Sequence, residues 1–288
     1  MSVQVKNIFH TYNKGNPDAK IALKDVSFSI NEGEILGVIG HTGSGKSTML
    51  QHLNGLLKPE SGQIIIGDID ITDEKVKMTE IRKRVGLVFQ YPEYQLFEET
   101  VAKDVAFGPK NLGMPDEEID ITVRKSLEMV GLSYDEIADR SPFELSGGQK
   151  RRVAIAGVIA MKPEVLILDE PTSGLDPYAH QEVLNMIRKI HKESTGIIIF
   201  VSHNMRDVAN MSDKVLVMDR GSVVAFDTPD EIFKKRDMLR NIGLSTTPSA
   251  VLFDKLDERG IHIETDAVRI DDVEEALFGY LTGGVHRD

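Results

Sequence analysis

The segment from Gly40 to Ser47 limits the possible folds of this chain more than any other. Its sequence, GHTGSGKS, matches the pattern G-x-x-x-x-G-K-[ST]. The apolar run Glu34–Gly40 precedes it, and apolar residues at helical spacing follow Lys46, so a strand, a loop and a helix come in order. A glycine-rich turn with a chance lysine would not need this context. We therefore predict a phosphate-binding loop in an α/β fold.

The residues of this loop have distinct expected roles around a nucleoside triphosphate. Glycines let backbone N–H groups approach the phosphate oxygens, and the helix start adds positive potential. Lys46 is expected to reach the β- and γ-phosphates, and the Ser47 hydroxyl to bind Mg²⁺, so ATP and Mg²⁺ are the expected cofactors. The predicted nucleotide-binding residues of this region are Gly40, His41, Thr42, Gly43, Ser44, Gly45, Lys46, Ser47 and Thr48.

A second motif is an apolar run, Val165–Leu168, that ends in Asp169 and Glu170. Adjacent residues of a strand point to opposite faces, so the two carboxylates can do different work. We expect Asp169 to hold Mg²⁺ and Glu170 to polarise the attacking water as a general base. An apolar strand with this ending is common, but its position about 120 residues after a phosphate loop favours the catalytic interpretation.

A third motif, LSGGQ at Leu145–Gln149, precedes the predicted helix Lys150–Met161. Ser146 is a good N-cap, and the two glycines leave room for a phosphate near the backbone. One ATP needs only one phosphate loop, so we interpret this segment as binding the nucleotide of a partner chain. The residues concerned are Ser146, Gly147, Gly148 and Gln149.

The three motifs together resemble the ATP-binding cassette (ABC) family over about residues 3–235. The resemblance implies an ATPase with an α/β P-loop NTPase fold of ABC type. Its parts would be a mixed β-sheet core, a helical subdomain at about 91–160 and a small C-terminal helical appendage. The implied domains are a nucleotide-binding domain at 1–240 and a dimerisation appendage at 241–288.

The same resemblance gives roles to four further residues. Tyr12 is similar to the aromatic residue that stacks on adenine, and Gln90 to the glutamine that reaches Mg²⁺ and the attacking water. Asp176 ends the sequence SGLD, which resembles the loop linking the two sites of a dimer. His203 resembles the histidine that binds the γ-phosphate. From the residues alone, Tyr12 could also be a surface aromatic and His203 a structural histidine, although His203 follows a core strand in the expected order.

The sequence of particular segments narrows the resemblance to energy-coupling factor transporters. The segments FQYPEYQLFEETVAKDVAFGPKNLG, LSGGQKRRVAIAG and the C-terminal tail carry it. It implies an importer of vitamins or transition-metal ions. Two related ATPases, of which this chain resembles the second (of the cobalt-transport type), form a heterodimer beneath a transmembrane coupling protein. A small substrate-binding membrane protein completes the implied complex. This chain would be peripheral on the cytoplasmic face of the cell membrane. The mixed aromatic and acidic stretch 91–101 suits a groove for a partner's helix.

Residues after about 240 have a different character. The sequence STTPSA at 245–250 is expected to be a linker. Two amphipathic stretches follow, Val251–Glu258 and Asp271–Leu281, which fit either a docked helical tail or a dimerisation element. Periodicity leaves both interpretations open, and only the resemblance favours dimerisation.

Composition excludes several functions. The chain has no cysteine, so it can form neither a disulfide nor a thiolate metal site. Its net charge of −12 disfavours binding to nucleic acid or anionic lipid. The longest apolar run, about Val153–Met161, is too short to span a bilayer, and the N-terminus lacks the pattern of a signal peptide. Another chain would therefore have to hold it at a membrane.

The main alternative is a soluble ABC ATPase that acts on nucleic acid or ribosomes. Only about 98 residues separate Ser47 from Ser146, without sustained heptads, which leaves no room for a long coiled-coil insertion. The chain also carries one set of cassette motifs, and its charge is acidic. These features favour the transporter function.

Overall fold

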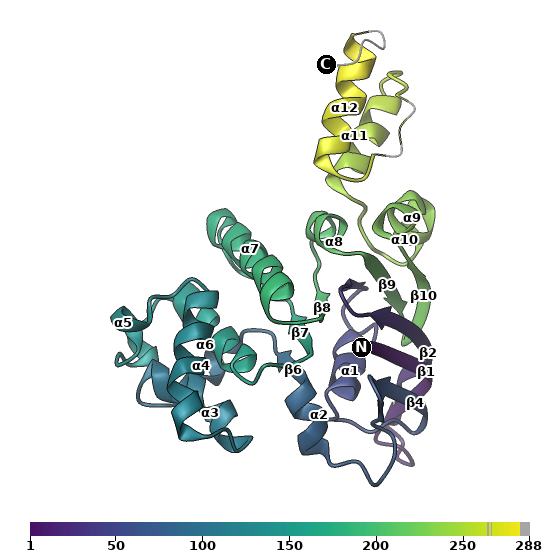
Figure 1. Cartoon of the computed structure of the whole chain (residues 1–288). Helices are drawn as coiled ribbons and strands as arrows, with labels where there is room; N and C mark the ends of the chain where they lie inside the picture. Colours follow the sequence, from purple (N-terminus) through teal and green to yellow (C-terminus); the bar gives the residue numbers. More distant parts are fainter. Residues whose placement is uncertain (264, 266, 283–288) are drawn as a thin grey trace.

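The computed structural model describes residues 1–263, 265 and 267–282, and Figure 1 shows helices packed around and between two β-sheets. The first sheet is antiparallel, with strand order β2-β1-β4-β5. Its alternating burial follows from one face packing on the core while the other meets solvent. The strands are β1 (Ser2–Tyr12), β2 (Lys20–Asn31), β4 (Ser61–Ile66) and β5 (Ile69–Asp70).

The second sheet has the order β10-β9-β3-β8-β7-β6. Five strands are parallel, and β10 pairs antiparallel with β9, so the sheet is mixed as predicted. Parallel strands bring their carboxyl ends to one edge of the sheet, which is where ligands bind in such folds. The strands are β3 (Ile35–Ile39), β6 (Val85–Val88), β7 (Val165–Asp169), β8 (Ile197–Val201), β9 (Lys214–Asp219) and β10 (Ser222–Asp227).

Helix α1 (Lys46–Leu53) joins the two sheets. Met49, Leu50 and Leu53 are buried in one apolar core together with inward side chains of both sheets. Because α1 starts directly at the predicted phosphate loop, this packing fixes the loop relative to the whole cassette.

The helical subdomain is present and confirms that part of the fold prediction (Figure 1). Its longest helices pack on one another, and α6 also contacts β6, so its apolar core is continuous with that of the mixed sheet. It follows α2 (Met78–Arg84) and β6. Its elements are η1 (Pro92–Gln95), α3 (Val101–Asn111), α4 (Asp116–Met129), α5 (Tyr134–Ile137), η2 (Pro142–Glu144) and α6 (Gly147–Ile159).

The last part of the chain is mostly helical. Figure 1 shows α11 and α12 projecting from the cassette as a separate pair, joined to it beside α9 and α10. The pair has a small core of its own, formed by Phe253, Ala267 and Val273. The helices after β7 are α7 (Pro177–Glu193), α8 (Met205–Met211), α9 (Pro229–Lys234), α10 (Arg236–Asn241), α11 (Pro248–Asp257) and α12 (Ile270–Leu281).

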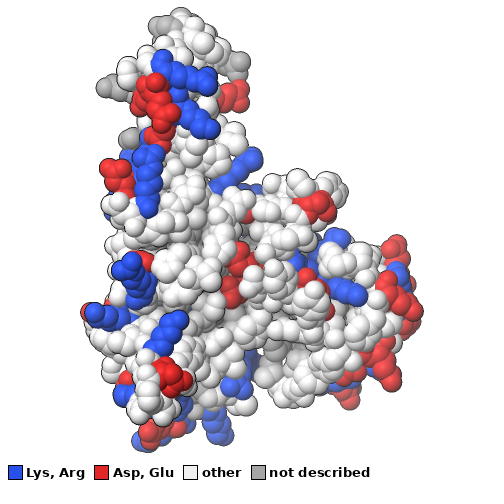
Figure 2. Space-filling view, turned by 180° about the vertical axis from the view of Figure 1, so that it is seen from behind, with Lys and Arg blue, Asp and Glu red and all other residues white. Residues whose placement is uncertain are grey.

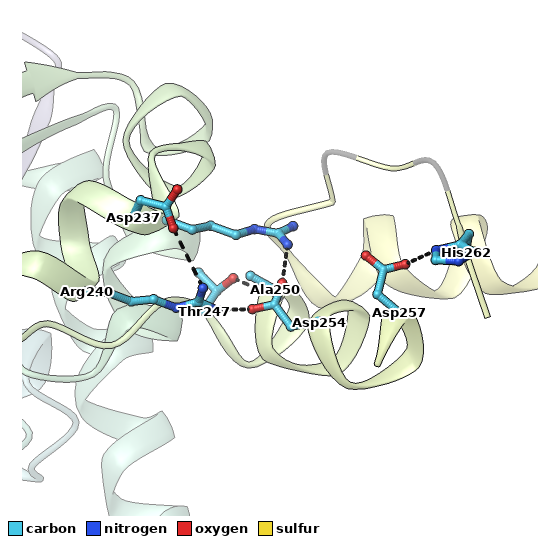
Figure 3. Close-up of polar contacts among 8 residues, drawn as sticks. Asp237, Arg240, Thr247, Ala250, Asp254, Asp257 and His262 are labelled. Atoms are coloured by element: carbon cyan, nitrogen blue, oxygen red, sulfur yellow. Dashed lines mark hydrogen bonds and ion pairs between the residues drawn. The ribbon is translucent and has the colours of Figure 1, made fainter. Parts of the chain in front are cut away.

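The junction with the appendage is more ordered than the sequence predicts. Arg236 and Arg240 of α10 both pair with Asp254 of α11, and Thr247 caps α11 (Figure 3). Thr246 and Thr247 are buried. The connection is therefore shorter than the linker expected at 245–250: residues 245–247 join α10 to α11 outside regular structure, but Pro248 already starts α11 and both threonines are buried. Residues 264, 266 and 283–288 of the expected appendage lie outside the described residues.

None of the helices formed by the described residues is both long enough and apolar enough to cross a bilayer.

Candidate active site

A cavity of about 390 Å³ opens at the carboxyl ends of β3, β7 and β8. It brings together the phosphate loop, the acidic end of β7 and the histidine after β8, as the order of the motifs predicts. Its lining residues are Tyr12, Lys20, Ile21, Ala22, Thr42, Gly43, Gly45, Lys46, Ser47, Thr48, Gln90, Asp169, Glu170, Val201 and His203.

The phosphate loop is held tightly by its neighbours. Gly45 has φ +102°, and a Cβ there would lie 2.7 Å from the Ala22 carbonyl oxygen, so only glycine fits. The Ser44 carbonyl accepts a hydrogen bond from the Gly221 amide at 2.9 Å. Lys46 Nζ donates to the carbonyl oxygens of Gly40 at 2.6 Å and His41 at 3.0 Å. The ammonium thus lies over its own loop, where a phosphate oxygen could replace these carbonyls.

The surroundings of the cavity shift the pKa values of its titratable groups toward the uncharged forms. Burial lowers the pKa of Lys46, although the nearby carboxylates of Glu170 and Asp169 partly offset this. Burial likewise raises the pKa of Asp169, although the Ser47 hydroxyl donates to Asp169 Oδ2 at 3.1 Å. The pKa of His203 is lowered, first by burial and then by the Lys46 charge. The four groups therefore form one coupled set.

Glu170 is the most perturbed of these groups. Burial, followed by repulsion from Asp169, raises its pKa to about 7. Its backbone has φ +53°, a left-handed conformation that is costly for a residue with a side chain and is often found at functional sites. Glu170 Oε1 lies 3.1 Å from His203 Nε2, but this buried oxygen has no hydrogen-bond donor among the described residues. A carboxylate that titrates near neutrality and has one oxygen free of a donor suits a general base that takes a proton from water.

The donor atoms of the cavity also fit Mg²⁺. The Ser47 hydroxyl and Asp169 carboxylate already lie in contact, and Gln90 lines the same cavity. Mg²⁺ prefers such oxygen ligands and keeps several waters, so it needs few protein groups.

The LSGGQ segment does not line this cavity. Ser146 caps α6 by accepting from the Gln149 amide at 3.3 Å, and Gln149 Oε1 accepts from the Ser146 amide at 3.0 Å. A Cβ added to Gly147 or Gly148 would meet nothing within 4 Å. A capped helix start with free space over two glycines is open to an anion from outside the chain.

Asp176 also lies outside the cavity. Its side chain caps α7, accepting from the amides of Tyr178 and Ala179, each at 3.0 Å. Within this chain its contacts are those of a helix cap.

Sequence analysis did not identify two groups of residues around the site. His10 and His52 lie behind Tyr12. Arg151, nearly fully buried, joins three segments: it pairs with Glu93 at 2.9 Å and donates to the carbonyls of Pro171 and Ser173. The sequence contains Arg151 shortly after LSGGQ and Glu93 shortly after Gln90, but only the fold shows that these two side chains meet.

Comparisons with known proteins agree with this geometry. The sequence model of the ABC transporter family matches residues 23–173. "Energy-coupling factor transporter ATP-binding protein EcfA2" of Caldanaerobacter subterraneus is 56% identical over 98% of this chain and 99% of its own. The protein of the same name from Clostridioides difficile is 54% identical, and the match covers 98% of this chain and 99% of that protein.

Solved structures show the same fold. CbiO1 from Clostridium perfringens, described as part of the ABC transporter complex cbiONQ, has a TM-score of 0.72 at 38% identity; the match covers 83% of this chain and 93% of that one. The ATP-binding cassette MJ0796, solved as a dimer in a post-hydrolysis state with ADP and Pi, has a TM-score of 0.70 at 30% identity. That match covers 79% of this chain and 98% of the other.

Proposed function

Since the chain belongs to the ABC transporter family and is one of its ATPases, we propose that it powers an energy-coupling factor importer by hydrolysing ATP at an interface with a second ATPase. One observation carries the proposal. The cavity holds a full set of groups for one triphosphate. Gly147 and Gly148, at the start of α6, do not line this cavity and have open space beside them. A chain with one complete phosphate site and half of another needs a second cassette to complete both.

In the proposed mechanism, ATP binds to the phosphate loop of one chain and the LSGGQ segment of the other. Lys46 holds the β- and γ-phosphates, and Glu170 takes a proton from the attacking water, which Gln90 and His203 help to position. We propose Ser47, Asp169 and Gln90 as the residues that hold Mg²⁺, which supplies charge neutralisation on the phosphates when bound. Cleavage removes the γ-phosphate that joins the two chains, so the dimer can open.

Opening does useful work only if a membrane partner moves with it. The segment after Gln90 presents exposed aromatic side chains, and Phe97 contacts Phe107 of α3 edge-on, with ring centroids 4.8 Å apart. Such a cluster on a monomer's surface marks a docking site, and we propose that a helix of the coupling protein binds here. The exposed residues are Tyr91, Tyr94, Phe97 and Phe107.

The relatives' names support the finer assignments. The names of these relatives contain "energy-coupling factor transporter ATP-binding protein". With the partners that the family resemblance implies, we propose a companion ATPase, a coupling protein and a substrate-binding membrane protein that captures a vitamin or a transition-metal ion. We propose that the chain is the second ATPase and lies peripherally on the cytoplasmic face. For the alternative, action on nucleic acid, the described residues on the face in Figure 2 offer little support. Basic and acidic side chains alternate there, and acidic ones gather on the helical subdomain.

The shared-site proposal can be tested with Gly148→Asp. The added carboxylate would face the partner's γ-phosphate, so ATP-dependent association with the companion ATPase should be lost, as measured by light scattering. ATP affinity of the chain alone should stay unchanged, because its own cavity is not touched. Ser133→Asp, which adds the same charge at an exposed helix cap, is the matched control and should associate normally.

Two outcomes would contradict the proposal. Weaker ATP binding by the isolated Gly148→Asp chain would mean that the LSGGQ segment serves its own nucleotide. Undiminished association would mean that the segment touches no nucleotide at all.

A further inference from the structure

Two histidines lie directly behind Tyr12. The His10 ring contacts the Tyr12 ring edge-on, with centroids 4.7 Å apart and an interplanar angle of 83°. On its other side, His10 contacts His52 in the same way, at 4.7 Å and 77°. Three aromatic rings in successive contact therefore connect α1 with the end of β1, where Tyr12 lines the nucleotide cavity.

Both ends of this line return to one residue, Thr48. His52 Nδ1 lies 2.7 Å from the Thr48 carbonyl oxygen, and the Tyr12 hydroxyl lies 3.2 Å from Thr48 Oγ1. The four residues thus form a closed circuit: Thr48, His52, His10, Tyr12 and back to Thr48. Thr48 follows Ser47 in the phosphate loop helix, so the circuit ties the Tyr12 ring to the phosphate-binding backbone.

The protonation of the circuit follows from its contacts. His52 is buried, and a nitrogen facing a carbonyl oxygen must donate, so Nδ1 carries a proton toward Thr48. Burial is the main cause of the lowered pKa of His52; the nearby His10 lowers it further, whereas the backbone groups of Thr48 and Lys58 oppose the shift.

The remaining imidazole nitrogens are unusual. His52 Nε2 and both ring nitrogens of His10 are buried without a hydrogen-bond partner among the described residues. A buried N–H without an oxygen partner is costly, and here its neighbours are aromatic rings, which are weak acceptors. A phenylalanine would fill the same space at less cost, so the imidazoles are not explained by packing alone.

We propose that His10 and His52 are positioning residues that hold the Tyr12 ring at a fixed place relative to the phosphate loop. The proposal rests on the proposed function, ATP hydrolysis at this cavity, and on the adenine contact that the family resemblance implies for Tyr12. Tyr12 is 38% exposed, and among the described residues it contacts the His10 ring and the Thr48 hydroxyl. Without His10 the ring would turn more freely, and nucleotide binding would have to order it. The position of the adenine contact relative to the phosphate contacts would then no longer be set through Thr48.

The test separates binding of the base from binding of the phosphates. We would measure the affinities of the full-length chain for ATP and for tripolyphosphate, which has no base, by calorimetry. His10→Leu should lower ATP affinity roughly fivefold to tenfold, a large part of what a stacked ring supplies, and leave tripolyphosphate affinity unchanged. His52→Leu should act in the same direction. His10→Phe keeps a flat ring at the same place and should retain most of the ATP affinity.

Tyr12→Leu provides the reference. It should lose at least as much ATP affinity as His10→Leu, and the double variant should lose no more than Tyr12→Leu alone, because both act through one ring. Equal loss of ATP and tripolyphosphate binding in His10→Leu would overturn the proposal, since it would show general damage to the loop. If His10→Leu fails to fold, the same comparison with His52→Leu decides the matter.

The proposed function and this inference fail differently. If Tyr12→Leu weakens ATP binding while His10→Leu and His52→Leu do not, the adenine contact stands and the positioning role is wrong. If Tyr12→Leu binds ATP normally, the adenine contact itself is wrong.

Discussion

At the scale of single residues, the environment that suits Glu170 to catalysis also lowers the stability of the folded protein. Its pKa is about 7 in the folded protein against an ordinary 4.5, chiefly because it is buried. An acid with a raised folded pKa destabilises the fold wherever it must ionise. The cost is absent below pH 4.5, grows as the pH rises, and is complete above about 7.

We expect Glu170→Gln to raise the free energy of unfolding by about 1–3 kcal/mol at pH 8 in chelator, without nucleotide, and by progressively less toward pH 5. The same variant should keep ATP binding and nearly lose turnover, because it lacks the base. Urea unfolding from pH 5 to 8 measures the first effect and a phosphate assay the second. Glu117→Gln, on the exposed face of α4, should show neither. A pH-independent gain in Glu170→Gln, or retained hydrolysis, would contradict the assignment.

The sequence was sufficient to predict that the phosphate loop, the end of β7 and His203 meet at one cavity, because each motif follows a strand whose end the parallel sheet fixes. It did not predict Lys20, Ile21 and Ala22, which line the cavity from β2, and three predicted loop residues, Gly40, His41 and Ser44, do not line it. It could not predict the pKa of Glu170, which depends on burial by segments far along the chain. It could not place His10 behind Tyr12 either, since irregular pairing between β1 and β2 near His10 sets which way these side chains point.

At the scale of elements, one buried ion pair connects the segment after Gln90 with α6 and the loop after β7. Arg151 bonds both carboxylate oxygens of Glu93, at 2.9 and 3.1 Å, and its Nη1 donates to the carbonyls of Pro171 at 3.2 Å and Ser173 at 2.8 Å. This pair lowers the pKa of Glu93 in spite of its burial. The η1 turn was not predicted, because Glu93 meets its partner 58 residues away.

Removing one member of a buried ion pair costs more than removing both, because the remaining charge stays unpaired. We therefore expect Arg151→Met to destabilise the chain by about 3–5 kcal/mol, and the double variant Arg151→Met/Glu93→Gln by clearly less. Arg151→Lys keeps the charge but not the forked geometry. It should bind ATP normally in the isolated chain and hydrolyse it more slowly in the assembled complex. Urea unfolding and turnover measure the two effects; equal destabilisation by the single and double Met variants would contradict the account.

At the scale of the whole molecule, the appendage projects from the cassette with a core of its own, yet several of its apolar side chains are exposed. Leu281 is 79% exposed and Tyr280 51%, both near the end of α12, and Leu252 of α11 is also exposed. A two-helix unit this small gains little from its own core, so exposed apolar side chains on it favour a partner over a docked tail. The pair Arg236–Asp254 would fix how α11 lies relative to α10.

We expect Tyr280→Ser/Leu281→Ser to weaken association with the companion ATPase at least tenfold, since each buried side chain of this size contributes about 1.5–3 kcal/mol to an interface. ATP affinity of the isolated chain should not change, because the appendage does not line the cavity. Truncation after Thr247 should have the same effect, and the cut belongs there because α11 begins at Pro248 and the buried Thr246 and Thr247 are kept. Ile121→Ser, at a 56% exposed position on α4, controls for loss of surface apolar area. Sedimentation of the purified pair measures the affinity. If it is unchanged in both appendage variants, the two ATPases are held together by their nucleotides and cassettes alone.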